Sequence, residues 1–273
     1  DWGRNGEPDQ KAVATQMGLT GEKSRARFVI SVGDNFYDNG VKSTSDSQWQ
    51  TSFEQVYTAP SLQVPWYAIL GNHDYHGNCD AQIEYGHTNA RWRMPARYYL
   101  RSETVAPGIT ADFFYLDTTP MAKLDPGETA KHTDLHAQDV PQQVAWLEQA
   151  LSASKAPWKI VIAHHPVYSG GVHGDTPYII QHILPLLEKH GVQAYFNGHD
   201  HDLQHLHAGQ VHFFCTGGGS KPRKSIKEIP QTRFGIGCSG FIAASLNADT
   251  LAVQLIDDQG KVLHVAEVPR QLS

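Results

Sequence analysis

Acidic, amide and imidazole side chains gather in five short segments of this chain, most of them beside an apolar run. The segments are DWG at the start, GDNFYDNG at 33–40, GNHD at 71–74, AHHP at 163–166 and GHDH at 198–201. GDNFYDNG alone could be a tight turn, because glycine with one Asn or Asp is enough for a turn. The recurrence of such clusters along the chain indicates instead that they converge on one site.

The residue types in these segments suit metal ions. The candidate oxygen donors are carboxylates, an amide and a phenol, the candidate nitrogen donors are imidazoles, and no cysteine takes part. That mixture favours iron, manganese or zinc over a structural cysteine–zinc site. The donors outnumber what one ion needs. Two ions sharing a bridging carboxylate would clamp both the attacking and the leaving oxygen of a phosphoryl displacement.

Apolar runs alternate with amphipathic stretches, a pattern that predicts an α/β domain able to bring these segments together. We expect strands at 27–32, 66–70, 112–117, 158–163 and 193–197, and helices at 8–18, 45–57, 79–90, 139–153 and 176–190. Ligands of open α/β sheets bind beyond the carboxyl ends of the strands, where the segments should meet. Short strands follow residue 205, with a hairpin at 247–249. The prediction is a single domain over 1–273 in which two mixed β-sheets pack face to face between helices.

Composition narrows the function classes. The net charge of −6 argues against a nucleic-acid partner, which needs a basic surface. No apolar stretch approaches the roughly 20 residues of a membrane span. The 16 histidines are in excess without a matching rise in Lys and Arg, and metal binding is the commonest use of surplus imidazoles. The 3 cysteines allow at most one disulfide, which we expect between Cys215 and Cys238.

The motifs GD-x-x-Y, GNHD, HHP and GHDH resemble those of the calcineurin-like metallophosphoesterases, and the tyrosine narrows the resemblance to the purple acid phosphatases. The flanks DWGR, AQIEY, RWRMPARYY and GHDHDLQHL are similar to the mammalian-type, tartrate-resistant branch. The resemblance implies a four-layer α/β/β/α sandwich. It also implies an acid phosphatase that hydrolyses phosphomonoesters by in-line attack of a metal-bound hydroxide at a dinuclear centre.

The resemblance further implies which residues hold a ferric ion. Asp1, Tyr37 and His201 would be its ligands, and Asp34 would bridge it to a second ion. Tyr37 as a phenolate would stabilise Fe(III) and give the protein a purple colour.

The second ion and the groups around the substrate follow from the same resemblance. A divalent iron, zinc or manganese ion would take the remaining ligands, which are Asn72, His164 and His199. His73 and His173 would stabilise charge or protonate the leaving oxygen, and Asp74 would orient the His73 imidazole.

The sequence opens on the first expected ligand. In the family this aspartate ends a central strand of about five apolar residues. We therefore expect a strand before Asp1, because an unfilled slot in the sheet would leave backbone groups unpaired.

Several other segments carry weaker predictions. The basic run at 221–228 is either a solvated loop or a rim that attracts anionic substrate. Residues 118–138 form a long polar loop that matches a repressive, protease-sensitive loop of the mammalian-type enzymes, so cutting it should raise activity. His165 either points away from the site or faces the substrate. Seven further histidines are expected on the surface: His132, His136, His182, His190, His205, His207 and His212.

Two alternative functions remain open at this point. One is a phosphodiesterase or nucleotide pyrophosphatase on the same site, and the other is a redox role in which the iron centre generates reactive oxygen. The expected partners are small phosphorylated substrates, including phosphopeptides or nucleotides, with no nucleic acid and no membrane. We expect a monomer that is periplasmic or secreted, following the family.

Overall fold

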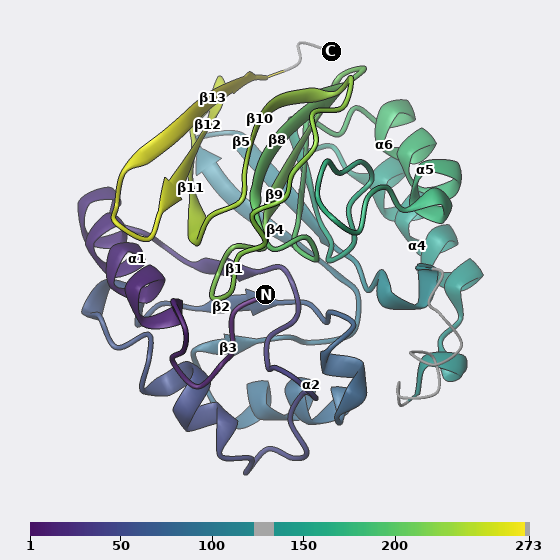
Figure 1. Cartoon of the computed structure of the whole chain (residues 1–273). Helices are drawn as coiled ribbons and strands as arrows, with labels where there is room; N and C mark the ends of the chain where they lie inside the picture. The colour runs from purple at the N-terminus through teal and green to yellow at the C-terminus, as the bar shows by residue number, and fades with distance from the viewer. Residues whose placement is uncertain (123–133, 271–273) are drawn as a thin grey trace.

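Two β-sheet layers lie face to face in the computed structural model, which describes residues 1–122 and 134–270 (Figure 1). One layer is a seven-stranded mixed sheet in the order β10-β8-β9-β7-β6-β5-β4. Its strands are β4 (Tyr99–Ala106), β5 (Ile109–Tyr115), β6 (Trp158–Ile162), β7 (Ala194–Asn197), β8 (Leu203–Ala208), β9 (Val211–Thr216) and β10 (Thr232–Ile236).

The facing layer consists of two three-stranded sheets. The parallel one contains β1 (Val29–Ser31), β2 (Trp66–Ala68) and β3 (Trp92–Arg93). The antiparallel one contains β11 (Gly240–Leu246), β12 (Thr250–Asp257) and β13 (Val262–Pro269). β11 and β12 pair from Gly240↔Asp257 to Leu246↔Leu251, so the hairpin predicted at 247–249 is confirmed.

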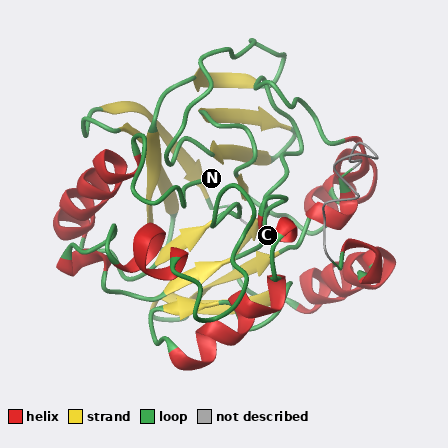
Figure 2. Ribbon diagram, turned by 60° about the horizontal axis from the view of Figure 1, so that its bottom comes forward, coloured by secondary structure: helices red, strands yellow, loops and turns green. Residues whose placement is uncertain are grey.

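Helices cover the outer face of each layer (Figure 2). They are α1 (Gln10–Ser24), α2 (Cys79–Thr88), α4 (Val140–Ala153), α5 (Pro177–His182) and α6 (Leu184–Lys189). Leu147 and Leu151 of α4 pack with Val161 and Tyr195 of the seven-stranded sheet. Val13 of α1 packs against the other layer. These contacts confirm the predicted fold class of two packed mixed sheets flanked by helices.

Some predicted elements differ from the structure. The helix expected over 45–57 contains a regular segment only at Trp49–Glu54, a six-residue π-helix. The helix expected over 176–190 is interrupted at Ile183, because Pro185 lies in the first turn of α6 and cannot continue the hydrogen bonding of α5. Strands β3, β4, β8, β10 and β13 were not predicted.

The disulfide prediction is wrong, because Cys79, Cys215 and Cys238 are all free. The Cys215 thiol is buried and lies 3.3 Å from the carbonyl oxygen of Asp200. The loop expected over 118–138 begins with a short 3-10 helix at Thr119–Met121, and its residues 123–133 lie outside the described residues.

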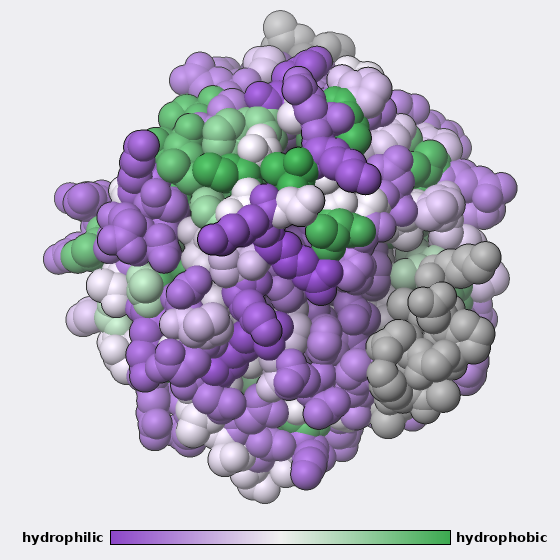
Figure 3. Space-filling model, in the orientation of Figure 1, coloured by the Kyte–Doolittle hydropathy of each residue, from purple (hydrophilic) through white to green (hydrophobic). Residues whose placement is uncertain are grey.

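A groove separates the two small sheets. β1 pairs only with β2, and β11 only with β12, so one edge of each strand is open within the described chain. A cavity of about 560 Å³ lies between them, lined by residues of both strands and, on its floor, by Ile160, Ile162 and Phe196. Figure 3 shows apolar side chains gathered over the part of this face where β11 and β12 lie in Figure 1, whereas much of the rest is hydrophilic. Among the described residues no helix has the length and apolarity needed to cross a membrane.

Candidate metal centre

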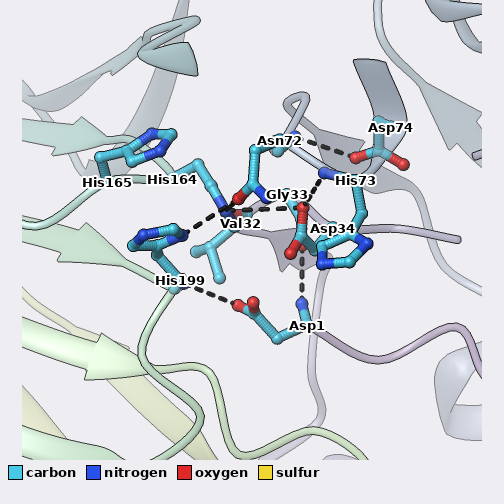
Figure 4. Close-up of polar contacts among 12 residues, drawn as sticks. Asp1, Val32, Gly33, Asp34, Asn72, His73, Asp74, His164, His165 and His199 are labelled. Atoms are coloured by element: carbon cyan, nitrogen blue, oxygen red, sulfur yellow. Dashed lines mark hydrogen bonds and ion pairs between the residues drawn. The ribbon is translucent and has the colours of Figure 1, made fainter. Parts of the chain in front are cut away.

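The ends of several strands deliver the predicted donor residues to one place (Figure 4). Asp34 follows β1, Asn72 follows β2, His164 follows β6, and His199 and His201 follow β7. We call these residues, together with Asp1 and Tyr37, the candidate metal centre. The structure thus brings all the predicted ligands together, in the position expected for the carboxyl ends of strands.

Asp1 reaches the centre by running alongside the end of β1. Its main-chain nitrogen donates to the Gly33 carbonyl at 2.7 Å, and the Trp2 nitrogen donates to the Asp34 carbonyl at 3.2 Å. Trp2 anchors this segment, since its indole donates to Ser31 Oγ at 2.7 Å and packs among buried aromatic rings, including Trp66. The backbone position of Asp1 is therefore fixed by its neighbour.

One group of donors surrounds the Tyr37 phenol. The Tyr37 hydroxyl donates to Asp34 Oδ2 at 2.7 Å and lies 3.0 Å from Asp1 Oδ1 and 2.9 Å from His201 Nε2. Asp1, Asp34 and His201 are buried. Their donor atoms lie within 4.8 Å of one another, which is close enough to hold one ion. Two buried carboxylates beside one phenol oxygen fit a cation, because buried charges need an opposite charge.

A second group of donors surrounds the Asn72 amide. Asn72 Oδ1 lies 3.0 Å from both His164 Nε2 and His199 Nδ1. His164 Nε2 is also 3.5 Å from Asp34 Oδ1. Asp34 therefore presents one carboxylate oxygen to each group, which is the geometry that a bridging ligand needs.

Carbonyl groups outside the centre orient two of its imidazoles. His164 Nδ1 lies 2.9 Å from the Val32 carbonyl, and His201 Nδ1 lies 2.8 Å from the Lys221 carbonyl. Because a carbonyl can only accept a hydrogen bond, Nδ1 carries the proton in each ring. The Nε2 lone pair then faces the other donors, as it does in histidines that bind metals.

The backbone at the centre adopts conformations that are uncommon for residues other than glycine. Asp34 has φ of +48° and His199 has φ of +69°. Such strain is often found at functional sites. The neighbouring glycines are needed for space, because a Cβ on Gly33 would lie 2.7 Å from His164 Nδ1 and one on Gly71 would lie 2.2 Å from Asp34 Oδ1.

Burial determines the protonation of the donors. It raises the pKa of Tyr37 well above its usual value, and the charge of Asp34 adds to this effect. The phenol therefore stays neutral unless a cation stabilises the phenolate. Burial also lowers the pKa of His164 to about 4 and of His201 to about 3, so both imidazoles are neutral and their lone pairs can bind a metal.

His73 lies beside the centre, but Asp74 does not orient its ring. The His73 ring packs 4.4 Å from the Tyr37 ring, and its Nδ1 lies 2.7 Å from the Asp38 carbonyl. Asp74 instead accepts hydrogen bonds from the main-chain nitrogens of Gly71 and Asn35, at 2.9 and 3.0 Å. Figure 4 shows its carboxylate pointing away from the His73 imidazole. The prediction for Asp74 is corrected accordingly: this carboxylate ties together the two loops that carry Asp34 and Asn72.

His173 and His165 both lie against His199. The His173 ring centroid is 4.2 Å and the His165 centroid 4.3 Å from that of His199. His165 is buried, and its Nδ1 lies 3.1 Å from Thr118 Oγ1. Ring nitrogens of His165, His164 and His199 also lie within 4.8 Å of one another. His165 therefore does not point away from the site.

Three residues that support the centre escaped the sequence analysis. The Arg4 guanidinium lies 3.5 Å from the centre of the Tyr37 ring. Thr118 Oγ1 accepts from the main-chain nitrogen of His165 at 2.9 Å. Asp200 accepts from the main-chain nitrogen of His173 at 2.9 Å and so fixes the loop that carries His173. Arg4 and Asp200 lie within the DWGR and GHDH motifs, and this position could have indicated their role.

Two oxygen- and nitrogen-rich groups that share one carboxylate, placed at the strand ends of a double-sheet sandwich, define a metallophosphoesterase. Residues 6–203 match the family model for the calcineurin-like phosphoesterases. The chain is 41% identical over 278 residues to purple acid phosphatase 3 of Arabidopsis thaliana, covering 97% of this chain and 74% of the relative. It is 34% identical over 275 residues to tartrate-resistant acid phosphatase type 5 of Sus scrofa, covering 96% of this chain and 80% of the relative.

The chain therefore belongs to the purple acid phosphatases of the calcineurin-like phosphoesterase family. It is a metal-dependent phosphatase that hydrolyses phosphomonoesters at a dinuclear centre, and the phosphodiesterase and redox alternatives are not favoured.

Solved structures agree on the fold. GAP50, described as the anchor in the inner membrane complex of Plasmodium, superposes with a TM-score of 0.88 at 26% identity, covering 100% of this chain and 87% of that one. Purple acid phosphatase PPD1 of yellow lupin gives a TM-score of 0.69 at 17% identity, covering 97% and 50% of the two chains. The second likeness shows the fold alone.

Proposed function

We propose that this phosphatase works at acid pH with a ferric ion and a divalent ion in the candidate metal centre. The ferric ion would be held by Asp1, Tyr37 and His201. Iron, zinc or manganese in the divalent state would be held by the other group, Asn72, His164 and His199. The observation that carries the proposal is the position of Asp34, whose Oδ2 contacts Tyr37 at 2.7 Å while its Oδ1 is 3.5 Å from His164 Nε2.

When bound, such a pair of ions supplies Lewis acidity and lowers the pKa of a coordinated water. The chain's own residues hold the ions and handle protons. Tyr37, which is neutral without a cation, would as a phenolate be the hard ligand that suits Fe(III). The carbonyl contacts at the Nδ1 atoms of His164 and His201 fix both rings, so that no reorientation is needed on binding.

His73 is the group we assign to the leaving oxygen. Its main-chain nitrogen donates to Asp34 Oδ1 at 2.8 Å, which places the residue directly beside the bridge. The Nδ1 contact with the Asp38 carbonyl leaves Nε2 as the nitrogen that faces substrate. General acids of this kind contribute about 10²–10⁴ in rate.

His173 is the second residue we assign to the substrate, in an outer position. Its ring packs on His199, and its loop is fixed by Asp200, which also accepts from Ser169 Oγ at 2.5 Å. Because burial lowers the pKa of the His173 imidazole, it acts as a proton donor only at acid pH.

The basic run at 221–228 lies against this site, which favours the rim over the simple solvated loop. The Lys221 carbonyl contacts His201 Nδ1, and the Arg223 nitrogen donates to the His201 carbonyl at 2.8 Å. Lys221, Arg223 and Lys224 are exposed. Their charges would attract small anionic phosphomonoesters, including phosphopeptides and nucleotides, towards the centre.

The reaction class can be tested with a matched pair of substrates. The purified enzyme is assayed with p-nitrophenyl phosphate and with bis(p-nitrophenyl) phosphate between pH 4 and pH 8. We expect the monoester to be strongly preferred, with the highest rate on the acid side. A preference for the diester would contradict the proposal. Secretion or a periplasmic location, and a monomeric state, follow the family and are part of the same proposal.

We also propose that an extended strand leading into Asp1 fills the groove between β1 and β11. The open edges of both strands, the apolar floor and the strand-like contacts of Asp1 with Gly33 support this assignment. A strand there would pair on both sides and join the two small sheets. Extending the chain by about five alternating apolar residues before Asp1 should raise the melting temperature and ferric-ion retention. An extension of the same length made of Gly and Ser is the control, and equal effects of both would contradict the assignment.

A further inference from the structure

Four histidines outside the candidate metal centre meet between the two sheet layers. His205 and His207 lie on β8, His212 on β9 and His264 on β13, and we call them the histidine cluster. His207 and His212 are directly opposite each other in the antiparallel register of β8 and β9. His205 is buried at 6% exposure, so its prediction as a surface residue was wrong. His207, His212 and His264 are half-buried.

Ring nitrogens of the cluster face one another at short range. His205 Nε2 lies 3.0 Å from His212 Nδ1, and His205 Nδ1 lies 2.9 Å from His264 Nε2. The His207 and His212 rings stack with centroids 4.3 Å apart. Phe214 stacks on His205 at 4.6 Å and Phe234 stacks on His264 at 4.8 Å, so the packing holds these rings in place.

The cluster is separate from the candidate metal centre. β8 begins just after His201, and His205 stands four residues further along, which is about 13 Å at the rise of a strand. The turn at the far end of β8 begins after Ala208, one residue beyond His207. Neither the ligands nor the proton donors of the phosphatase site are part of this cluster.

The surroundings keep these imidazoles neutral. Burial, with smaller contributions from its histidine neighbours, lowers the pKa of His205 to about 3. Burial likewise lowers the pKa of His212 to about 4, with contributions from His207 and Arg233. Apart from burial, the neighbours that act on both rings are histidines and Arg233, whose positive charge opposes protonation. Neutral imidazole is the commonest metal ligand in proteins.

The nitrogen spacing matches two ligands of one ion. Histidine nitrogens bind Zn²⁺ at about 2.0–2.1 Å, and two nitrogens 3.0 Å apart then subtend roughly 94° at the ion. The His264 contact supports this arrangement, because His205 can donate its Nδ1 proton to His264 and turn the Nε2 lone pair towards His212. A hydrogen-bonded outer partner of this kind is typical of metal-binding histidines.

We propose that the facing nitrogens of His205 and His212 form a second metal site, which takes one divalent transition-metal ion. His207 supports the site through its ring, which stacks on His212. An all-imidazole donor set suits Zn²⁺ or Cu²⁺ and gives little affinity for Mg²⁺ or Ca²⁺, which prefer oxygen ligands. His264 positions His205 and does not bind the ion itself.

The test is a zinc titration of the enzyme whose dinuclear centre is already loaded. Wild type should bind one further Zn²⁺ per chain by calorimetry and by metal analysis. His212→Ala should weaken that binding at least tenfold while phosphatase turnover stays unchanged. His182→Ala, at an exposed histidine outside the cluster, is the matched control and should bind like wild type.

A second variant and a second readout guard against misfolding. His207→Ala changes a half-buried residue and should weaken zinc binding at least threefold with the melting temperature retained. Cu²⁺ placed at the site should show hyperfine coupling to imidazole nitrogens that His212→Ala removes. If wild type binds no further ion, or if all variants bind zinc equally, the cluster is only a chain of hydrogen-bonded imidazoles and the proposal fails.

Discussion

The candidate metal centre and the histidine cluster both bring imidazole nitrogens to about 3 Å from another donor, but their neighbours differ. In the centre, His164 lies beside the Asp34 carboxylate and the Asn72 amide. In the histidine cluster, burial does most to lower the pKa of His205, and its charged neighbours are other imidazoles and Arg233. Carboxylates and a phenolate can offset much of the charge of a trivalent and a divalent ion, whereas neutral imidazoles alone suit one divalent ion. The kind of donor, more than the number of histidines, decides what each region can hold.

The largest effect should come from removing the shared carboxylate. Asp34→Ala deletes the residue that faces both donor groups, so we expect both ions to be lost and turnover to fall by about 10⁴ or more. Metal analysis and a p-nitrophenyl phosphate assay measure the two effects together. Asp249→Asn, which removes an exposed carboxylate far along the chain, is the control and should behave like wild type. A variant Asp34→Ala that keeps two ions would contradict the bridging role.

The next effect should come from the proton donors beside the centre. His73→Ala should lower kcat by about 10² while both ions stay bound, because its ring contacts Tyr37 but is not one of the proposed ligands. His173→Ala should act in the same direction with a smaller loss. Activated leaving groups need less protonation, so the deficit should shrink with p-nitrophenyl phosphate relative to an alkyl phosphate. An equal loss of kcat on both substrates would contradict the proton-donor role.

These two regions also show what could be read from the sequence. Each ligand motif of the centre except DWG is a short contiguous peptide after an apolar run, so residue types and their position at strand ends were enough to bring Asp34, Asn72 and His164 together. The histidine cluster joins β8 and β9 to β13, a contact between sheets that no local pattern encodes. His205 therefore read as a surface residue although it is buried.

The same reason explains the misplaced role of Asp74 and the missed strand β4. Asp74 follows His73 directly, yet the loop turns its carboxylate towards the main chain of Asn35 and Gly71. The sequence of β4, YLRSETVA, alternates between more and less buried residues, but its charged residues kept it from being predicted as a strand. Arg101 on this strand is not solvated but lies 3.8 Å from the centre of the Tyr67 ring. In each case a tertiary contact outweighs the local pattern.

A moderate effect should come from the basic rim. Reversing the charges of Lys221, Arg223 and Lys224 to Glu should raise KM severalfold at low salt, with kcat nearly unchanged. The increase should vanish at high ionic strength, where the Debye length falls to a few ångströms. Reversal of Lys261, a distant exposed lysine, is the control. An unchanged KM in the rim variant would indicate that residues 221–228 are only a solvated loop.

The smallest expected effect is on the pH dependence of the free energy of unfolding, and it tests the histidine cluster. The folded pKa of His205 is about 3 and the unfolded value is about 6.5, so the unfolded chain binds more protons below pH 6.5. The stability that neutral His205 contributes is therefore present above pH 6.5 and lost as the pH falls towards 3. His205→Phe should reduce the loss between pH 6.5 and pH 4 by about 3 kcal/mol in the free energy of unfolding.

Chemical denaturation of wild type and His205→Phe at both pH values measures this difference. His182→Phe, at an exposed position, should follow wild type. If the two curves fall equally with pH, His205 titrates alike in the folded and unfolded chains. When the dinuclear centre is already loaded, added zinc at pH 6.5 should stabilise wild type but not the variant, which links the measurement to the proposed second site.

The central claim is that Tyr37 is a phenolate ligand of a ferric ion, and the visible absorption spectrum of the purified protein tests it most directly. We predict a broad band in the green that makes the solution purple and that disappears in Tyr37→Phe. A colourless wild-type protein that contains a full complement of iron would contradict the claim.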